Sequence, residues 1–123
     1  MKIYVAHASG FDFTKQLYEP LIHSPLAEQH EFVFPHIDRN AGQNSKRIIP
    51  DCDLFVAEIS YPSTGLGIEI GRAEAAGVPI IAFARDGAEI SSSIGFVTQT
   101  VIRYYGYHDL VSKLQALIDA QAS

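Results

Sequence analysis

The sequence predicts an α/β protein with a flavodoxin-like (Rossmann-like) five-stranded parallel sheet in the order 2-1-3-4-5 and helices on both faces. Short runs of apolar, β-prone residues alternate with longer segments of helical period, which is typical of such sheets. The length of 123 residues suits a single domain over residues 1–123, and 47% apolar residues allow a packed core. Right-handed crossovers between five strands most simply give this strand order.

The first half of the chain should hold two strands and two helical segments. Proline ends or kinks a helix because it lacks a backbone donor and clashes with the preceding turn. The expected elements are a strand over Lys2–Ala6, a helix over Phe11–Glu28 broken or kinked near Pro20 and Pro25, a strand over Glu31–Phe34, and a short helix over Gly42–Ile49 that ends at Pro50.

The second half begins with Asp53–Ile59, a run of the kind that a central strand buried on both faces would show. Gly77 is placed to end the helix expected over Gly67–Ala76. The further expected elements are a helix over Gly67–Ala76, a strand over Pro79–Ala84, a loop over Ser91–Gly95, a strand over Val97–Tyr104, and a helix over Tyr107–Ala120 with Leu110, Leu114, Leu117 and Ile118 on one face.

The amino-acid composition limits the kinds of partner and bound group that the protein could have. A net charge of −5 with scattered Lys and Arg argues against a nucleic-acid polymer or a membrane as partner and leaves a small ligand possible. We expect a cytoplasmic protein, because no apolar run is long enough for a membrane span and the N-terminus turns polar too early for a signal peptide. The single cysteine, Cys52, is interpreted as structural, and the five histidines lack metal-site spacing, so we expect no metal and no cofactor.

The richest segment joins the central strand to the following helix and contains Ser63, Gly65, Gly67 and Glu69. In this fold, ligands bind at the carboxyl ends of the strands near the switch point between the first and third strands. The two glycines are expected to turn the chain and to let backbone donors approach a ligand. Glu69 is expected in the first helical turn, where the dipole favours its ionised form. It could then act as a nucleophile, or it could only complement the helix terminus.

The segment Asp53 to Phe83 resembles the nucleoside 2-deoxyribosyltransferase superfamily, including deoxynucleoside 5′-monophosphate N-glycosidases. The resemblance rests on a strand ending in AEIS, then YPSTGLGIEIGRA and GVPIIAF, with an opening KIYVA similar to the family's first strand. It implies a flavodoxin-like enzyme that cleaves an N-glycosidic bond, in which Glu69 attacks C1′ and forms a ribosyl-enzyme intermediate. A carboxylate near an oxocarbenium-like transition state fits that chemistry.

Six residues before the nucleophile, family transferases typically carry an acid, whereas the monophosphate hydrolases resemble this chain in having a serine, Ser63. A serine hydroxyl tolerates a phosphate that a carboxylate would repel. Two departures concern the substrate: the stretch His7 to Asp12 lacks the arginine of the hydrolases' phosphate loop, and Asn44-Ser45 stands where the family commonly has an aspartate. The predicted substrate-binding residues, beside catalytic Glu69, are His7, Ser9, Gly10, Phe11, Asp38, Tyr61, Ser63, Gly65 and Gly67.

The sequence leaves several residue roles and the reaction type open. His7, His36 and Asp38 are candidates to activate the leaving group, and Phe11 and Tyr61 to stack on a nucleobase. A non-catalytic nucleotide sensor and a TIR-like NAD nucleosidase are alternative functions, and hydrolysis and transfer are not distinguished. The resemblance also implies a homodimer or larger homo-oligomer whose neighbouring subunit helps to close the site.

Overall fold

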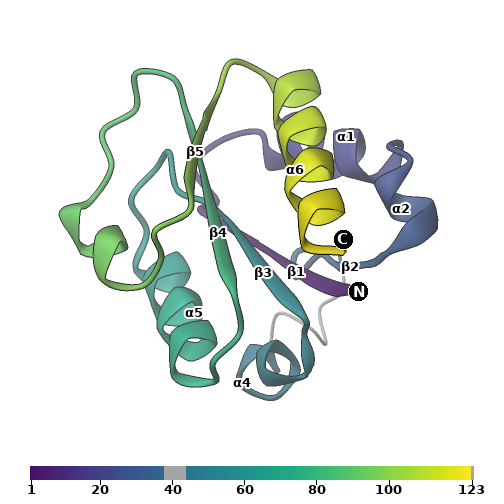
Figure 1. Cartoon of the computed structure of the whole chain (residues 1–123). Helices are drawn as coiled ribbons and strands as arrows, with labels where there is room; N and C mark the ends of the chain where they lie inside the picture. Colours follow the sequence, from purple (N-terminus) through teal and green to yellow (C-terminus); the bar gives the residue numbers. More distant parts are fainter. Residues whose placement is uncertain (38–43, 123) are drawn as a thin grey trace.

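The computed structural model describes residues 1–37 and 44–122. Its core is one parallel sheet in the order β2-β1-β3-β4-β5, which confirms the predicted topology (Figure 1). The strands are β1 (Lys2–His7), β2 (Glu31–Val33), β3 (Leu54–Glu58), β4 (Ile80–Arg85) and β5 (Val101–Tyr104). Every residue of β3 is buried, as expected for a strand covered on both faces.

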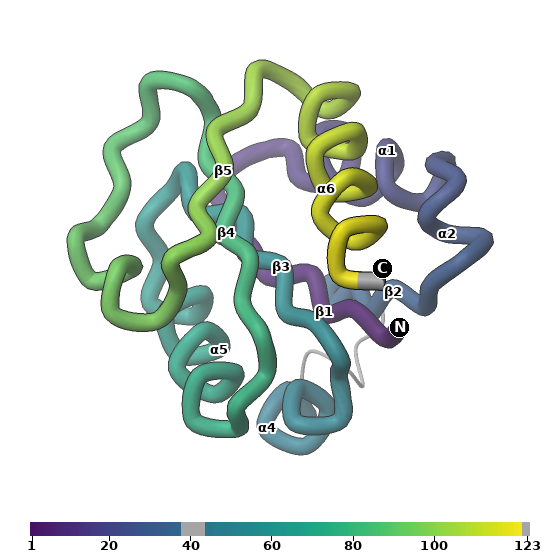
Figure 2. Tube along the Cα trace, in the orientation of Figure 1, coloured from purple at the N-terminus to yellow at the C-terminus, as the bar shows by residue number. Residues whose placement is uncertain are grey.

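Helices cover both faces of the sheet. In Figures 1 and 2, α4 and α5 lie on one side, and α1, α2 and α6 lie on the other. The helical elements are η1 (Thr14–Tyr18, a π-helix), α1 (Glu19–Ile22), α2 (Leu26–Gln29), α4 (Ser45–Ile48), η2 (Ile49–Asp51), α5 (Thr64–Ala75), η3 (Ser92–Phe96) and α6 (Tyr107–Ala122). Within the described ranges, none of these helices has the length and hydropathy that a bilayer crossing requires.

Two separate hydrophobic clusters fill the space between the sheet and its helices. Tyr4 and Phe55 point toward α5 and pack with Leu66, Ile70 and Ala73, whose spacing places them on one helix face. On the other side, Phe83 and Tyr104 pack with the predicted apolar face of α6, formed by Leu110, Leu114 and Ile118 with Leu117 at its margin. Alternation along each strand therefore sends successive residues to different helices.

The predicted N-terminal helix is broken before Pro25, whereas near Pro20 the π-helix η1 continues directly into α1. Pro20 lies in the first turn of α1, and Pro25 is the residue that precedes α2. Proline is tolerated at such positions because the first helical N–H groups have no partner within the helix. The break leaves three short helical pieces between β1 and β2 in place of one continuous helix.

The expected glycine-rich turn before α5 is wrong. The helix begins at Thr64, three residues earlier than predicted, and Ser63 is its N-cap, with Oγ accepting a hydrogen bond from the Leu66 N–H at 3.4 Å. Gly65 and Gly67 are therefore helical, and within the described ranges positive φ angles occur at Gly77 (73°) and Gly87 (84°). The N-cap and the packing of the helix's apolar face outweigh the low helix propensity of glycine. Gly77 ends the helix as predicted.

The segment before β5 also differs from the prediction. Ser92–Phe96 forms a 3₁₀ helix where a loop was expected, and Ser91 caps it through a hydrogen bond from the Ser93 N–H at 3.3 Å. The strand starts at Val101, because the Thr98 hydroxyl instead donates to the Ile80 carbonyl at 2.6 Å and accepts from the Thr100 N–H at 3.0 Å. These side-chain contacts hold Thr98 out of the ladder, while the Thr100 carbonyl still accepts from the Ala82 N–H of β4.

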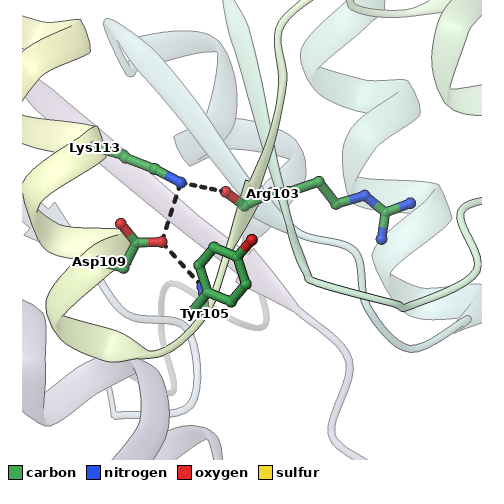
Figure 3. Close-up of polar contacts among 4 residues, drawn as sticks. All are labelled: Arg103, Tyr105, Asp109 and Lys113. Carbon is green, nitrogen blue, oxygen red and sulfur yellow. Dashed lines mark hydrogen bonds and ion pairs between the residues drawn. The ribbon is translucent and has the colours of Figure 1, made fainter.

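Two side chains of α6 form hydrogen bonds with backbone groups on the outer edge of the sheet, at and just after β5 (Figure 3). The Thr100 carbonyl accepts from the Ala82 N–H of β4, and the Tyr104 carbonyl accepts from the N–H of Asp86, just after β4. The Arg103 carbonyl faces the other way, toward α6. Lys113 Nζ donates to that carbonyl at 2.8 Å, and the Asp109 carboxylate accepts from the Tyr105 N–H at 3.0 Å. Lys113 and Asp109 also form an ion pair at 3.1 Å. Part of the sheet edge is thereby capped by its own helix.

Candidate active site

The candidate nucleophile Glu69 extends from α5 toward β1. Its carboxylate accepts a hydrogen bond from the hydroxyl of Tyr4, a β1 residue that is fully buried in the core facing α5. The Tyr4 ring stacks on Phe55 of β3, with centroids 5.5 Å apart and planes within 4°. A rigid aromatic side chain in the sheet therefore holds the half-buried carboxylate in one orientation.

The electrostatics of Glu69 differ from the prediction. Glu69 is the sixth residue of α5, so it lies in the second turn, and the expected placement in the first turn is wrong. Burial raises the pKa of its carboxyl, while the Tyr4 hydroxyl, His36 and Arg72 act in the opposite direction. The helix dipole acts mainly within the first turn, so it contributes little to the ionised form of Glu69. The groups that favour ionisation are instead the neighbouring side chains.

Arg72 lies one helical turn beyond Glu69 and connects α5 to α4. Its guanidinium donates a hydrogen bond to the hydroxyl of Ser45, which is buried. Ser45 belongs to the pair at the position where the resembled family commonly carries an aspartate. Ser45 offers Arg72 a neutral hydroxyl where an aspartate would offer a negative charge. The positive charge of Arg72 therefore favours the ionised form of Glu69.

Two loop aromatics predicted to contact a base lie against each other at the strand ends. Phe11, from the loop after β1, stacks on Tyr61, from the turn after β3, with ring centroids 5.0 Å apart and planes at 20°. Tyr61 retains 36% of its surface exposed. The pair forms an accessible aromatic surface of the kind on which a nucleobase can stack.

His7, at the carboxyl end of β1, is only 4% exposed. Its Nδ1 lies 2.7 Å from the Ala8 carbonyl and its Nε2 lies 2.5 Å from the Tyr18 hydroxyl. Since a carbonyl only accepts, we assign the proton to Nδ1, and Nε2 then accepts from Tyr18. Burial is the main cause that lowers the His7 pKa to about 4, with His36 adding to the effect. In this arrangement both ring nitrogens are occupied within the protein.

Tyr18 also connects this histidine to the second strand. Its hydroxyl oxygen accepts from the His36 N–H at 3.3 Å, and the His36 ring lies 4.9 Å from that of His7 and 4.8 Å from that of Phe13. The exposed His36 side chain, which follows β2, thus lies beside the carboxyl end of β1. It also lies close enough to Glu69 to lower the pKa of that carboxyl. We call the edge of the sheet formed by the carboxyl ends of its strands, with the loops that follow them, the strand-end rim.

The other predicted substrate-binding residues are distributed around this rim. Ser9 and Gly10 form an exposed bend after β1, and Ser63 is exposed at the start of α5. Asp38 lies outside the described residues, so its contribution stays a prediction. No group of three or more His, Cys, Asp or Glu side chains suited to a metal occurs in the two described ranges.

A pocket of about 340 Å³ lies on another flank of α5, toward η3. Among the predicted site residues it includes Tyr61, Ser63 and Gly67, but Glu69 does not line it. Its apolar lining consists of Ile59, Leu66, Ile70, Ile94 and Val97. A wider pocket of about 660 Å³ between α1 and α6 contains none of the predicted site residues. The Tyr61 turn therefore borders both the strand-end rim and an apolar pocket.

Reasoning from the sequence missed two parts of the site. Tyr4 lies in the expected first strand and was not among the predicted site residues, although a buried tyrosine usually needs a hydrogen-bond partner for its hydroxyl, and that requirement was an available signal. The contact between Arg72 and Ser45 joins residues 27 positions apart. No local pattern indicates that pairing, because it depends on how α4 packs beside α5.

No protein-family model matches the chain, but two curated proteins and a solved structure resemble it. A 65-residue stretch is 45% identical to a Syntrophotalea carbinolica protein named "Putative 2′-deoxynucleoside 5′-phosphate N-hydrolase 1", covering 50% of this chain and 46% of that protein. An 81-residue stretch is 35% identical to a protein of the same name from Thermofilum pendens, covering 64% and 57%. The chain therefore spans about half the length of the curated relatives it matches.

A solved structure matches nearly the whole chain. The CMP N-glycosidase of Clostridium botulinum superposes with a TM-score of 0.71 at 25% sequence identity, covering 94% of this chain and 99% of that one. Together with the curated relatives, this likeness confirms the resemblance of the chain to the nucleoside 2-deoxyribosyltransferase superfamily and its nucleotide N-glycosidases.

Proposed function

We propose that the chain hydrolyses the N-glycosidic bond of a nucleoside 5′-monophosphate, with Glu69 as the nucleophile. The observation that carries the proposal is the carboxylate of Glu69, which is half-buried and accepts a hydrogen bond from the Tyr4 hydroxyl of β1. The names of the similar proteins support the reaction class and a phosphorylated substrate. In this proposal, the sheet orients the carboxylate and the loops bind the substrate.

The reaction would proceed in two displacements. A Glu69 carboxylate oxygen attacks C1′ of the sugar, and the bond between C1′ and the base nitrogen breaks with its electron pair leaving on the base. The base takes up a proton. Water then attacks C1′ of the glycosyl-enzyme ester and gives up a proton to solvent, and the bond between C1′ and the Glu69 oxygen breaks, which releases the sugar phosphate and returns Glu69 to its carboxylate form. The first step requires ionised Glu69, so activity should fall when the pH drops through the pKa of this carboxyl.

His36 is the described residue best placed to help the leaving base. His7 is a poor proton donor near neutral pH, because both of its ring nitrogens are occupied and its pKa is lowered to about 4. The side chain of His36 is exposed on the rim and is electrostatically coupled to Glu69. We therefore assign His36 the proton transfer to the base, and Asp38 stays an alternative donor.

Substrate contacts follow from the rim. The stacked pair of Phe11 and Tyr61 would hold the base, and the exposed Ser63 hydroxyl at the start of α5 would meet the 5′-phosphate. A helix N-terminus favours an anion through its dipole and its unpaired N–H groups. That contribution would offset the missing arginine in the loop after β1. Ser9 and Gly10 of the same loop would contribute further donors to the phosphate.

The proposal includes a homodimer or a larger assembly. Phe96 in η3 is 88% exposed, between two residues, Ile94 and Val97, that line the pocket of about 340 Å³. A protruding apolar ring beside an apolar pocket is suited to a contact between copies of the chain. Light scattering on the purified protein should therefore give a mass of at least twice 13.5 kDa, and a monomeric mass would contradict this part of the proposal.

The decisive experiment compares wild type with Glu69→Gln on a panel of nucleosides, their 5′-monophosphates and NAD, with released base measured by chromatography. Wild type should release base from at least one monophosphate. Glu69→Gln should lose turnover while its affinity stays within about tenfold, because the amide keeps the shape and loses the nucleophile. Glu74→Gln is the matched control, since Glu74 is exposed on the same helix and should be dispensable.

Each contrary outcome identifies an alternative. Binding without cleavage by wild type would favour a nucleotide sensor, and consumption of NAD alone would favour the TIR-like reaction. Exchange of bases between nucleosides without net hydrolysis would identify a transferase. Retention of most activity by Glu69→Gln would refute the covalent mechanism and leave the carboxylate with a structural role.

A further inference from the structure

Glu58, the last residue of β3, is a buried carboxylate that the proposed reaction does not use. Its side chain is 1% exposed and lies on the face of the sheet toward α6, as its contact with Tyr104 shows. Glu69 approaches the sheet from the opposite face, beside Tyr4. Burying a carboxylate is costly unless it is well hydrogen-bonded, so its contacts should explain its presence.

Most of these contacts fasten one residue of the following turn. One carboxylate oxygen of Glu58 accepts from the Ser60 N–H at 2.7 Å, and the other accepts from the Ser60 hydroxyl at 2.8 Å and from the Tyr104 hydroxyl. The Ser60 oxygen in turn accepts from the Arg85 N–H at 2.8 Å, at the end of β4. The N–H and the hydroxyl of Ser60 are thus held by residues at the ends of β3 and β4.

The residue that follows this anchor is Tyr61, whose ring stacks on Phe11. The position of α5 has independent support, because Ser63 caps it and the faces of Leu66 and Ile70 are packed in the core. Loosening Ser60 should therefore displace the Tyr61 ring more than it displaces Glu69. The network acts on the aromatic surface of the rim and leaves the nucleophile in place.

We propose that Glu58 is a positioning residue that holds Tyr61 against Phe11 by fixing Ser60. An apolar side chain could fill the same space in the core, but it could not accept hydrogen bonds from the Ser60 N–H and hydroxyl. The ring placement stands on the structure alone, and its consequence for catalysis rests on the proposed function. In that reaction, Glu58 would affect base binding and spare the bond-breaking step.

The test uses three variants and a direct readout of the ring contact. Glu58→Leu keeps most of the volume and removes every acceptor, whereas Glu58→Gln keeps an acceptor for the Ser60 N–H. Tyr104→Phe removes the Tyr104 hydroxyl but leaves both hydrogen bonds from Ser60 to Glu58 in place. Nuclear Overhauser contacts between the rings of Phe11 and Tyr61 should be present in wild type, Glu58→Gln and Tyr104→Phe, and lost in Glu58→Leu.

A folded Glu58→Leu protein that retains the ring contacts would overturn the inference. If that variant does not fold, Ser60→Ala serves in its place, because it removes the hydroxyl that bridges Glu58 and the Arg85 N–H. Ser60→Ala should weaken the same ring contacts, and unchanged contacts would again overturn the inference. This readout requires no substrate, so it decides the inference even if wild type cleaves no nucleotide.

Kinetics supply the second readout. On a substrate that wild type cleaves, Glu58→Leu should raise KM about tenfold or more, the scale of losing one aromatic stack on a base, with kcat within about threefold. Glu58→Gln should restore KM toward wild type. A purely structural defect would instead lower apparent kcat through a smaller active fraction and leave KM unchanged, which would contradict a positioning role.

Discussion

Replacing Tyr4 with phenylalanine should separate the nucleophile from its support without disturbing the core. The phenylalanine ring can keep the stacking on Phe55, and the substitution removes only the hydroxyl that donates to Glu69. That hydrogen bond lowers the pKa of a carboxyl that burial raises. Without it, Glu69 should hold its proton to higher pH, and the acidic limb of the pH–rate profile should move upward.

The size of the effect follows from the kind of bond that is lost. A hydrogen bond to a charged group contributes about 1.5–3 kcal/mol, which corresponds to about a ten- to 150-fold loss of kcat/KM on the acidic limb. The loss should shrink as the pH rises above the shifted limb, because Glu69 then ionises without help. The assay is the rate of base release at pH values from 4 to 9, with folding checked by circular dichroism.

Tyr104→Phe is the matched control for this experiment. It removes the hydroxyl of another buried tyrosine, but that hydroxyl donates to Glu58 on the opposite face of the sheet. Its pH–rate profile should have the wild-type limb. A Tyr4→Phe profile identical to wild type, in a folded protein, would show that the hydroxyl does not set the protonation of the nucleophile.

Three further predictions concern other parts of the molecule. Ser63→Asp should lower kcat/KM for a monophosphate about tenfold or more and spare the matching nucleoside, because a charge about 4 Å from the phosphate costs about 1–4 kcal/mol. Ser63→Ala should lose only about one hydrogen bond. Equal losses of kcat/KM on both substrates would show that Ser63 shapes the turn and does not contact the phosphate. The His7 pKa is lowered to about 4, so the unfolded chain gains that proton first as the pH falls, and the free energy of unfolding should drop by up to about 3 kcal/mol between pH 6.5 and 4. Denaturant titrations of wild type and of non-titrating His7→Phe test this, and equal slopes against pH would refute it. Leu114→Ala should destabilise the fold by about 2–5 kcal/mol, since the Leu114 side chain of α6 is fully buried against the sheet, whereas Ser112→Ala, at an exposed position of the same helix, should change stability by less than about 0.5 kcal/mol in the same titration.

The sheet was predictable because its signals are local and repeated. Each strand is a short apolar run, and handedness then limits the order in which such strands can pair. The start of α5 was not predictable on the same basis, because Gly65 and Gly67 favour a turn when taken alone. The cap at Ser63 and the burial of Leu66 decide the outcome, and the burial appears only once the helix lies on the sheet.

The candidate site was predictable in part. Glu69, Phe11 and Tyr61 could be selected because they follow strands or lead a helix near the switch point. The contact between Tyr4 and Glu69 spans 65 positions, and it depends on the exact rotation of α5 over β1. His7 was selected for its place at a strand end, but sequence does not show that Tyr18 and the Ala8 carbonyl would occupy both of its nitrogens.

The capped outer edge of β5 also limits how copies of this chain can join. Continuing the sheet from one copy into the next requires free backbone groups along the edge strand. Around Arg103 and Tyr105 those groups are already bonded to Lys113 and Asp109 of the same chain (Figure 3). A strand added there would have to displace both side chains first. Self-association on this side of the sheet should therefore proceed through helix and loop surfaces, and conditions that break the Lys113–Asp109 pair should favour strand addition at β5.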